Sequence, residues 1–347
     1  MRRCLSFDDV LISPVKTTIT SRSTPDISTK IAGIKVKIPI LSSPMDTVTD
    51  GLFANSLSQH GGIGIVHRFL SEESQLKELN IAAKAGAVYF AIGVGSSELN
   101  RYKFLYDSLG PDKIGFVNID IANGHSTICS KMIEEIKAYS PLVRVVAGSV
   151  ATGSGYRFLA DSGADGVRVG IGGGSICKTR IMTGIGVPTF HSVFDCATER
   201  ASSSLYDDVS IIADGGIRYP SDAVKSLIAG ADAVMCGKVF AQTRESCGTK
   251  VNDFNGGCYK VYRGMASREV QMEKRGGLKA GTCAEGVQTM LEVNTTLKNV
   301  IDDFGGGIRS AMTYVNARNI SELRKNSEFI EITNSGMIES HAFGTQN

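Results

Sequence analysis

One stretch of the sequence combines a possible nucleophile with a glycine-rich loop. Residues 169–180 read Val-Gly-Ile-Gly-Gly-Gly-Ser-Ile-Cys-Lys-Thr-Arg. Val169 is the last residue of a short apolar run, and the glycines follow it directly. Consecutive glycines let backbone N–H groups converge on an anion, or carbonyls on a cation. Cys177 is flanked by glycine, lysine and arginine instead of core-forming residues, and Lys178 and Arg180 favour its thiolate wherever their charges lie near the sulfur. We therefore interpret Cys177 as a candidate nucleophile rather than a packing thiol.

Glycines also follow two later apolar runs. Asp214 precedes Gly215 and Gly216, and Gly237 ends the other run. Where such runs are the seventh and eighth strands of a barrel, glycines at their ends form a phosphate site. Asp214 suits sugar hydroxyls, and a helix N-cap is the alternative interpretation.

Two further clusters have the chemistry to hold a nucleotide or a cofactor. Ser43 and Met45 follow the first apolar run, where Met45 is either core filler or a contact to a base. Asp120, Asn123 and Gly124 follow the fourth run. Their carboxylate and amide groups suit a cofactor's ribose or amide, and a plain turn is the alternative.

The elements that must position these residues are eight short apolar runs alternating with segments of helical character. Continuously apolar strands alternating with helices predict a parallel sheet covered on both faces, and eight such units predict a (βα)8 TIM barrel. An open doubly wound sheet would need G-x-G-x-x-G at its first turn, which instead reads SSPMD. The predicted strands are 38–42, 62–66, 88–92, 115–119, 144–147, 166–169, 210–213 and 233–235, and the predicted helices include 71–85, 126–139, 153–163 and 221–230.

The carboxyl-terminal third does not follow this alternation. Residues 237–304 are spotted with glycine and mixed charge, which is more typical of a functional flap than of a linker. Residues 305–347 indicate a closing helix, a short strand and a tail. We expect one TIM-barrel domain over 1–347, with a catalytic flap at roughly 240–300.

Composition excludes several classes of protein. The net charge is +2 with scattered positive residues, so nucleic-acid binding has little electrostatic support. No apolar run reaches the roughly 18 to 20 residues of a membrane span. Asp8 and Asp9 stand where a signal peptide would need an apolar core, and the eight cysteines include no C-x-x-C pair. These features predict a cytoplasmic protein with reduced thiols.

Nine segments in combination make the chain resemble a known family over nearly its whole length. The family is that of inosine monophosphate dehydrogenase and guanosine monophosphate reductase. The segments are FDDVLISP, PILSSPMDTVTD, GGIGIVHR, IDIANGHS, VVAGSVAT, ADGVRVGIGGGSICKTR, ADGGIRYPSDAVKSLIAGADAVMCG, YRGMAS and GGGIRSAMTYV.

The resemblance implies that Cys177 attacks C2 of the purine and forms a covalent nucleotide adduct during hydride transfer. It implies that Asp214 binds the ribose, that Met265 and Glu285 read the base, and that four residues hold the phosphate, namely Ser175, Gly216, Gly237 and Tyr262. The complete expected substrate set is Ser43, Met45, Ser175, Asp214, Gly216, Gly237, Tyr262, Gly264 and Met265.

The resemblance also implies partners for the chain. A nicotinamide cofactor, expected to be NADPH, would contact Asp120, Asn123 and Gly124. Backbone carbonyls of Gly172, Gly174 and Cys177 would hold a monovalent cation, K+. The small-molecule substrate would be GMP or IMP, and the assembly a homotetramer.

The flap favours the reductase over the dehydrogenase. Dehydrogenases of the family hydrolyse the adduct with an Arg-Tyr pair on the flap, and residues 265–285 contain no such dipeptide. Thr179 and Glu285 occupy positions that reductases use to handle ammonia. The inserted CBS regulatory module of most dehydrogenases is absent. We therefore expect conversion of GMP and NADPH to IMP, ammonia and NADP.

Two alternatives stay open. An IMP dehydrogenase with an unusual flap would use Arg268 or Arg275 in place of the missing base, and the tail at 339–341 resembles that enzyme. A nucleotide-binding regulator without turnover is the other, because Gly173 replaces the family's usual proline and Lys178 its usual threonine.

Overall fold

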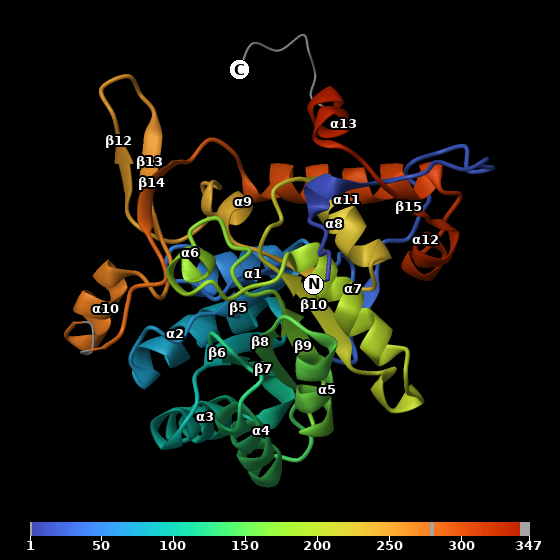
Figure 1. The fold of residues 1–347 in the computed structure, drawn as a ribbon. Helices are drawn as coiled ribbons and strands as arrows, with labels where there is room; N and C mark the ends of the chain where they lie inside the picture. Colours follow the sequence, from blue (N-terminus) through green and yellow to red (C-terminus); the bar gives the residue numbers. More distant parts are fainter. Residues whose placement is uncertain (1, 278–280, 341–347) are drawn as a thin grey trace.

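A closed barrel of eight parallel strands organises the molecule. The computed structural model describes residues 2–277 and 281–340 (Figure 1). The eight predicted apolar runs form the barrel strands, so the predicted (βα)8 TIM barrel is confirmed, and β11 pairs with β4 to close it. The strands are β4 (Ile40–Ser42), β5 (Ile63–Val66), β6 (Val88–Ile92), β7 (Ile114–Asp120), β8 (Val145–Val150), β9 (Gly166–Val169), β10 (Ser210–Asp214) and β11 (Ala233–Cys236).

Strand residues alternate between the barrel interior and the layer beneath the helices. Tyr89 and Phe116 point inward and their ring centroids lie 4.8 Å apart. Phe90 and Val117, their neighbours in sequence, belong to the outer core that the helices cover. Both faces of the barrel sheet are buried, so these strands are apolar throughout instead of alternating between apolar and polar residues.

Helices surround the barrel, and the four predicted segments are confirmed as helices. Polar N-caps start several of them, because a side-chain oxygen satisfies a free N–H of the first turn. Asp50 accepts from the backbone N–H of Phe53, and Thr152 from that of Gly155. The helices are α1 (Gly51–Gln59), α2 (Glu72–Ala82), α3 (Ser96–Leu109), α4 (Thr127–Tyr139), α5 (Gly153–Asp161), α6 (Thr179–Thr183), α7 (Thr189–Arg200) and α8 (Pro220–Ile228).

The segment after β11 contains more regular structure than its glycines predicted. An antiparallel sheet of β12 (Lys250–Asn252), β13 (Cys258–Arg263) and β14 (Gln288–Glu292) stands away from the barrel in Figure 1. It follows α9 (Lys238–Ala241), and the excursion between β13 and β14 carries α10 (Arg268–Arg275). The closing helix, expected from residue 305, begins earlier as α11 (Leu297–Tyr314), because Thr296 caps it.

The segments before β4 and after α11 pack against the barrel. The hairpin of β2 (Thr29–Ile31) and β3 (Ile34–Val36) adds Ile31 and Val36 to the core of the barrel interior. Strand β1 (Val10–Ile12) pairs with β15 (Phe329–Glu331), and α12 (Ile320–Asn326) and α13 (Asn334–Glu339) flank that strand along the chain. Among the helices described, none combines the length and apolar character needed to cross a bilayer.

Candidate active site

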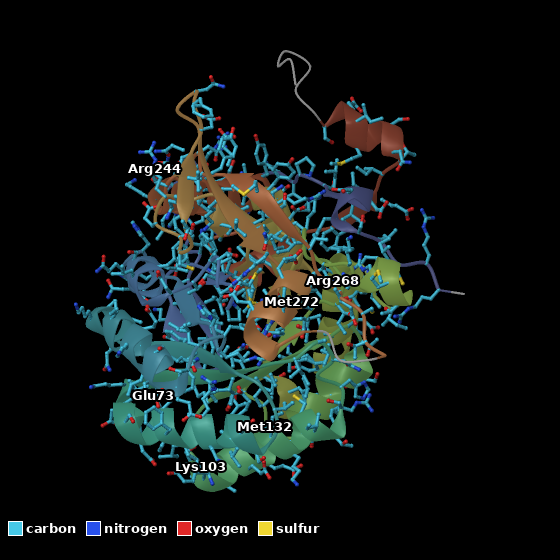
Figure 2. All side chains as sticks on the ribbon, turned by 90° about the vertical axis from the view of Figure 1, so that its left-hand side faces the viewer. Glu73, Lys103, Met132, Arg244, Arg268 and Met272 are labelled. Carbon is cyan, nitrogen blue, oxygen red and sulfur yellow. The ribbon has the colours of Figure 1, made fainter. Side chains whose placement is uncertain are left out.

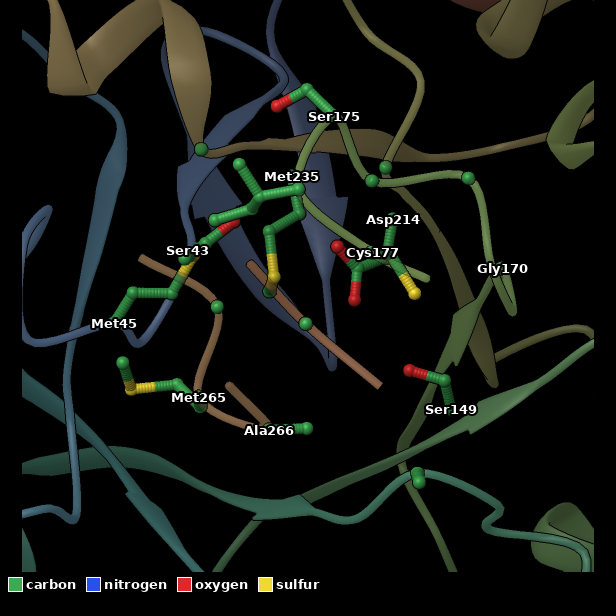
Figure 3. Close-up of a pocket in the computed structure, with 18 of the residues that line it drawn as sticks. Ser43, Met45, Ser149, Gly170, Ser175, Cys177, Asp214, Met235, Met265 and Ala266 are labelled. Atoms are coloured by element: carbon green, nitrogen blue, oxygen red, sulfur yellow. The ribbon is translucent and has the colours of Figure 1, made fainter. Parts of the chain in front are cut away.

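A cavity of about 910 Å³ opens where the eight barrel strands end. Residues at the end of each barrel strand or in the loop after it line the cavity, together with two flap segments. Figure 3 shows Cys177 and Asp214 facing the same space as Met45 and Met265. Most of the residues expected at the site therefore meet there. They are Ser43, Met45, Asp120, Gly172, Gly174, Ser175, Cys177, Thr179, Asp214, Gly216, Gly237, Tyr262, Gly264, Met265 and Glu285.

Two expected cofactor residues do not line this cavity. Asn123 accepts a hydrogen bond from the backbone N–H of His125 at 3.2 Å, which closes a turn. Gly124 donates its N–H to the carbonyl of Ser149 at 2.7 Å. A Cβ on Gly124 would lie 3.1 Å from Cα of Gly148, so glycine lets the β7 loop pack on β8. Both residues take part in the turn after β7, and their role as cofactor contacts stays a prediction.

The candidate nucleophile lies in a loop that pairs with the far end of the flap. Sγ of Cys177 lies 3.1 Å from the hydroxyl of Thr179. The N–H of Lys178 donates to the carbonyl of Glu285 at 2.7 Å, and the N–H of Val287 donates to the carbonyl of Ile176 at 3.0 Å. This short ladder brings Glu285 and Thr179 to the nucleophile.

The near end of the flap joins the same ladder. The N–H of Gly264 donates to the carbonyl of Val287 at 3.0 Å, and the N–H of Glu285 donates to that of Ala266 at 3.1 Å. A Cβ on Gly286 would lie 3.0 Å from the backbone nitrogen of Ser267, so the approach needs glycine. Three chain segments thus meet at Cys177, and Met265 enters the cavity between two of them.

The phosphate candidates gather at another part of the cavity. Tyr262 is buried, and its burial raises the pKa of the phenol to about 12, against the opposing effect of a hydrogen bond with Ser175. A Cβ on Gly237 would lie 2.9 Å from the Tyr262 hydroxyl and 3.4 Å from that of Ser43. Glycine at this strand end therefore leaves room beside two hydroxyl groups, which suits an anion with several oxygens.

Arg168 on β9 is a site residue that the sequence did not indicate. Its Nη1 donates to Asp120 at 2.7 Å and its Nη2 to Asp214 at 2.6 Å. Burial by itself lowers the pKa of the guanidinium, and the two carboxylates outweigh that effect and raise it above its ordinary value. The sequence feature that could have indicated it is an arginine within an otherwise apolar predicted strand, 166–169.

A second unexpected cation lies where β5 ends. Arg68 lines the cavity beside Phe69, with its guanidinium 4.8 Å from the ring centroid. Its Nε lies 3.8 Å from a carboxylate oxygen of Asp120 and, among the residues described, has no hydrogen-bond partner. A buried donor without a partner is costly, so this nitrogen is suited to a ligand.

One of the two arginines proposed as a substitute base in a dehydrogenase lies away from the cavity. Arg268 is exposed on α10, the helix that it marks with Met272 in Figure 2, and it does not line the cavity. The side chain of Arg275 and residue His341 of the tail lie outside the part of the chain that the structure describes. Within that part, no group of three or more His, Cys, Asp or Glu side chains is arranged to hold a metal ion.

The base of the flap is fastened to the loop after β4. Arg263 donates from Nε to Asp46 at 3.0 Å. The buried Nζ of Lys260 donates to the carbonyl of Thr47 at 2.7 Å, to the Ser246 hydroxyl at 2.6 Å and to the carbonyl of Cys247 at 2.6 Å. These contacts hold the strand that carries Tyr262 against the loop that carries Met45.

Lys260 should make stability depend on pH in the alkaline range. Burial lowers its pKa to about 8, below the value of the unfolded chain, so the unfolded state binds more protons between these two values. The free energy of unfolding therefore gains roughly 3 kcal/mol from this group as pH rises from about 8 towards 10.5. In Lys260→Met this gain is lost, as urea unfolding at pH 7.5 and 9.5 would measure. The exposed Lys30→Met variant is the control, and an equal pH slope in Lys260→Met and the native protein would contradict the expectation.

Comparison with known proteins identifies the family. Residues 4–343 match the IMP dehydrogenase / GMP reductase domain. An inosine-5'-monophosphate dehydrogenase of Cryptosporidium parvum is 32% identical over 396 residues, covering 97% of this chain and 94% of that protein. A GMP reductase of Vibrio campbellii is 33% identical over 347 residues, covering 99% and 98%. The predicted resemblance is thereby confirmed, and the chain belongs to the IMP dehydrogenase and GMP reductase family.

Proposed function

We propose that this chain is a GMP reductase, which converts GMP and NADPH to IMP, ammonia and NADP. The observation that carries the proposal is the short ladder between the catalytic loop and the end of the flap. It pairs the backbone of Glu285 with that of Lys178, the residue after Cys177, and the hydroxyl of Thr179 lies 3.1 Å from the sulfur. Relatives named for either activity are about equally similar, so the choice rests on these residues and on a flap without an Arg-Tyr dipeptide.

The nucleotide is proposed to lie across the cavity with its phosphate towards Tyr262 and its base towards Cys177. Ser175, Gly216, Gly237 and Tyr262 would hold the phosphate. Asp214 would accept hydrogen bonds from the ribose hydroxyls. The base would lie among the remaining members of the expected set, namely Ser43, Met45, Gly264 and Met265.

In the first step the Cys177 thiolate attacks C2 of GMP. The bond from sulfur to C2 forms and the bond from C2 to the exocyclic nitrogen breaks, so that nitrogen must gain a proton to leave as ammonia. We assign the delivery of that proton to Glu285 and Thr179. Reduced nicotinamide supplies a hydride to C2 when bound. The bond from C2 to sulfur then breaks, IMP is released and Cys177 returns to the thiolate.

The residues on the β5 to β8 side of the cavity fit a nicotinamide dinucleotide. Arg68 offers a partly buried cation with an unpartnered Nε, which suits a phosphate. Asp120 offers a carboxylate for ribose hydroxyls, and Ser149 lines the same side. The preference for NADPH over NADH is part of the proposal.

The remaining parts of the proposal concern the cation and the assembly. Main-chain carbonyls suit a monovalent cation, so the loop carbonyls of Gly172, Gly174 and Cys177 fit K+ by donor chemistry. We extend the proposal to one barrel domain with a flap at roughly 240–300, assembled as a cytoplasmic homotetramer.

The test is the absorbance of the reduced nicotinamide with purified protein in both directions. Loss of NADPH signal with GMP, matched by ammonia release, is the expected result. A rise in signal with IMP and NAD, and none in the other direction, would overturn the proposal in favour of the dehydrogenase. Silence in both directions with GMP still bound would overturn it in favour of a regulator.

A further inference from the structure

We propose that Arg168 is a positioning residue that couples the nucleotide and cofactor halves of the cavity. The inference rests on the proposed function in assigning Asp214 to the nucleotide and Asp120 to the cofactor. It adds that the orientations of the two carboxylates depend on each other, because one guanidinium orients both.

The geometry places a single buried cation between two carboxylates from different strands. Arg168 rises from β9, whereas Asp120 ends β7 and Asp214 ends β10. The Arg168 side chain is 7% exposed and the two carboxylates are 19% and 17% exposed, so water screens the three charges weakly. The contacts use Nη1 for Asp120 and Nη2 for Asp214, so one guanidinium bonds to both anions.

Strand β8 packs closely against β9 beside this arginine. A Cβ on Gly148 of β8 would lie 2.6 Å from Cβ of Arg168 and 2.8 Å from its carbonyl oxygen. Glycine at 148 therefore lets the two strands approach at the point from which the Arg168 side chain starts.

The contacts also leave each carboxylate able to bind a ligand. Both bonds from Arg168 to Asp214 end on Oδ2, from Nε at 3.1 Å and from Nη2 at 2.6 Å, which leaves Oδ1 for a sugar hydroxyl. On Asp120 the bond ends on Oδ1, while Oδ2 faces Arg68. Arg168 fixes the rotamers of both groups before any ligand arrives, which lowers the entropic cost of binding.

Removing the arginine has a specific electrostatic consequence. Two anions would then face each other in a poorly solvated barrel mouth, and like charges so placed cost free energy. The loss of nucleotide binding at Asp214 would therefore come partly from repulsion by the Asp120 carboxylate. Neutralising Asp120 should repair nucleotide binding in the variant without Arg168, although Asp120 itself does not touch the nucleotide.

The experiment is a double-mutant cycle on GMP affinity, measured by titration calorimetry without any cofactor. Arg168→Met should weaken GMP binding about 10- to 100-fold, the cost of leaving buried carboxylates unpaired. Asp120→Asn alone should change it less than about 3-fold. Adding Asp120→Asn to Arg168→Met should restore at least about 5-fold of the lost affinity, and Arg168→Lys, which keeps the charge, should lie between native and Arg168→Met.

A role in packing alone predicts the opposite sign. In that case the second substitution would leave the affinity of Arg168→Met unchanged or weaken it further, and that result would overturn the proposal. If Arg168→Met does not fold, as judged by circular dichroism, the same comparison is made in Arg168→Gln, which also removes the charge and keeps a polar side chain. Arg157→Met, at a surface ion pair with Glu199, is the control for losing an arginine.

Failure of this inference and failure of the proposed function are distinguishable. The cycle measures binding of a nucleotide that the cavity would hold in either direction of the reaction, and it is repeated with IMP. A dehydrogenase would still give the restoration with IMP. If the chain reduces GMP but Asp120→Asn does not restore GMP affinity in Arg168→Met, the coupling role of Arg168 is wrong and the assignment as a reductase stands.

Discussion

Cys177→Ala is expected to abolish conversion of GMP, lowering kcat by at least roughly 10⁴-fold. Alanine offers no group that forms a bond with C2 of the purine, so the exocyclic nitrogen has no route to leave. Binding of GMP should change little, because the residues proposed for the phosphate and ribose, apart from Ser175, lie on other segments of the chain. The ion pair of Arg168 with Asp214 and the hydrogen bond of Tyr262 with Ser175 do not involve the sulfur, so they should survive its removal.

The loss of NADPH absorbance measures turnover, and calorimetry measures GMP affinity. Cys283→Ala is the matched control, because Cys283 is the other cysteine whose residue lines the cavity and its thiol is exposed. It should keep most of the activity. Near-native turnover in Cys177→Ala would exclude the covalent mechanism, and loss of turnover in both variants would exclude a role specific to Cys177.

The barrel could be predicted because burial on both faces leaves a simple pattern. Strands such as β6 and β8 are buried at every position, so they stand out as short apolar runs between polar segments. The flap sheet leaves no such pattern. All three residues of β12 are exposed, and β13 alternates irregularly between buried and partly buried positions. Its pairing with β14 is long-range and depends on a register that composition does not encode.

The helices were predictable in part. α4 buries four apolar residues on one face, including Met132, Ile133 and Ile136, and its sequence has matching helical spacing. α3 buries only Tyr102, Leu105 and Leu109 in fourteen residues that are otherwise mostly polar. Its apolar face is narrow, so the periodic signal is weak.

The candidate site was predictable where its residues lie in strand-end loops. Cys177, Asp214 and Gly237 could be found because glycines and polar groups follow apolar runs there. Arg168 could not, because its partners lie 48 and 46 residues away and only barrel closure brings them together. Arg68 likewise could not be recognised as a site residue from the sequence, because only the fold brings it beside Asp120. Asn123 and Gly124 illustrate another case, in which residue types suited to ligand binding also make the hydrogen bonds of a turn.

Glu285→Gln is expected to lower kcat for GMP by about 10²- to 10³-fold with little change in KM. Glutamine keeps the shape of the side chain and cannot donate a carboxylic proton, so the departure of ammonia slows. The backbone ladder should survive the change, because it uses the N–H and carbonyl of residue 285 and not its side chain. Glu269→Gln, exposed on α10 of the same flap, is the matched control and should be active.

The two half-reactions separate a chemical role of Glu285 from a structural one. Starting from IMP and NADP, formation of the sulfur adduct transfers a hydride and involves no ammonia. A single turnover in that direction should therefore be slowed much less in Glu285→Gln than the step that releases ammonia from GMP. If Glu285 only held the flap on the catalytic loop, both half-reactions would fall together, since each needs Cys177 at C2. Equal losses in the two would assign the proton to another donor, and the Thr179 hydroxyl, 3.1 Å from the sulfur, would be the next group to remove by Thr179→Val.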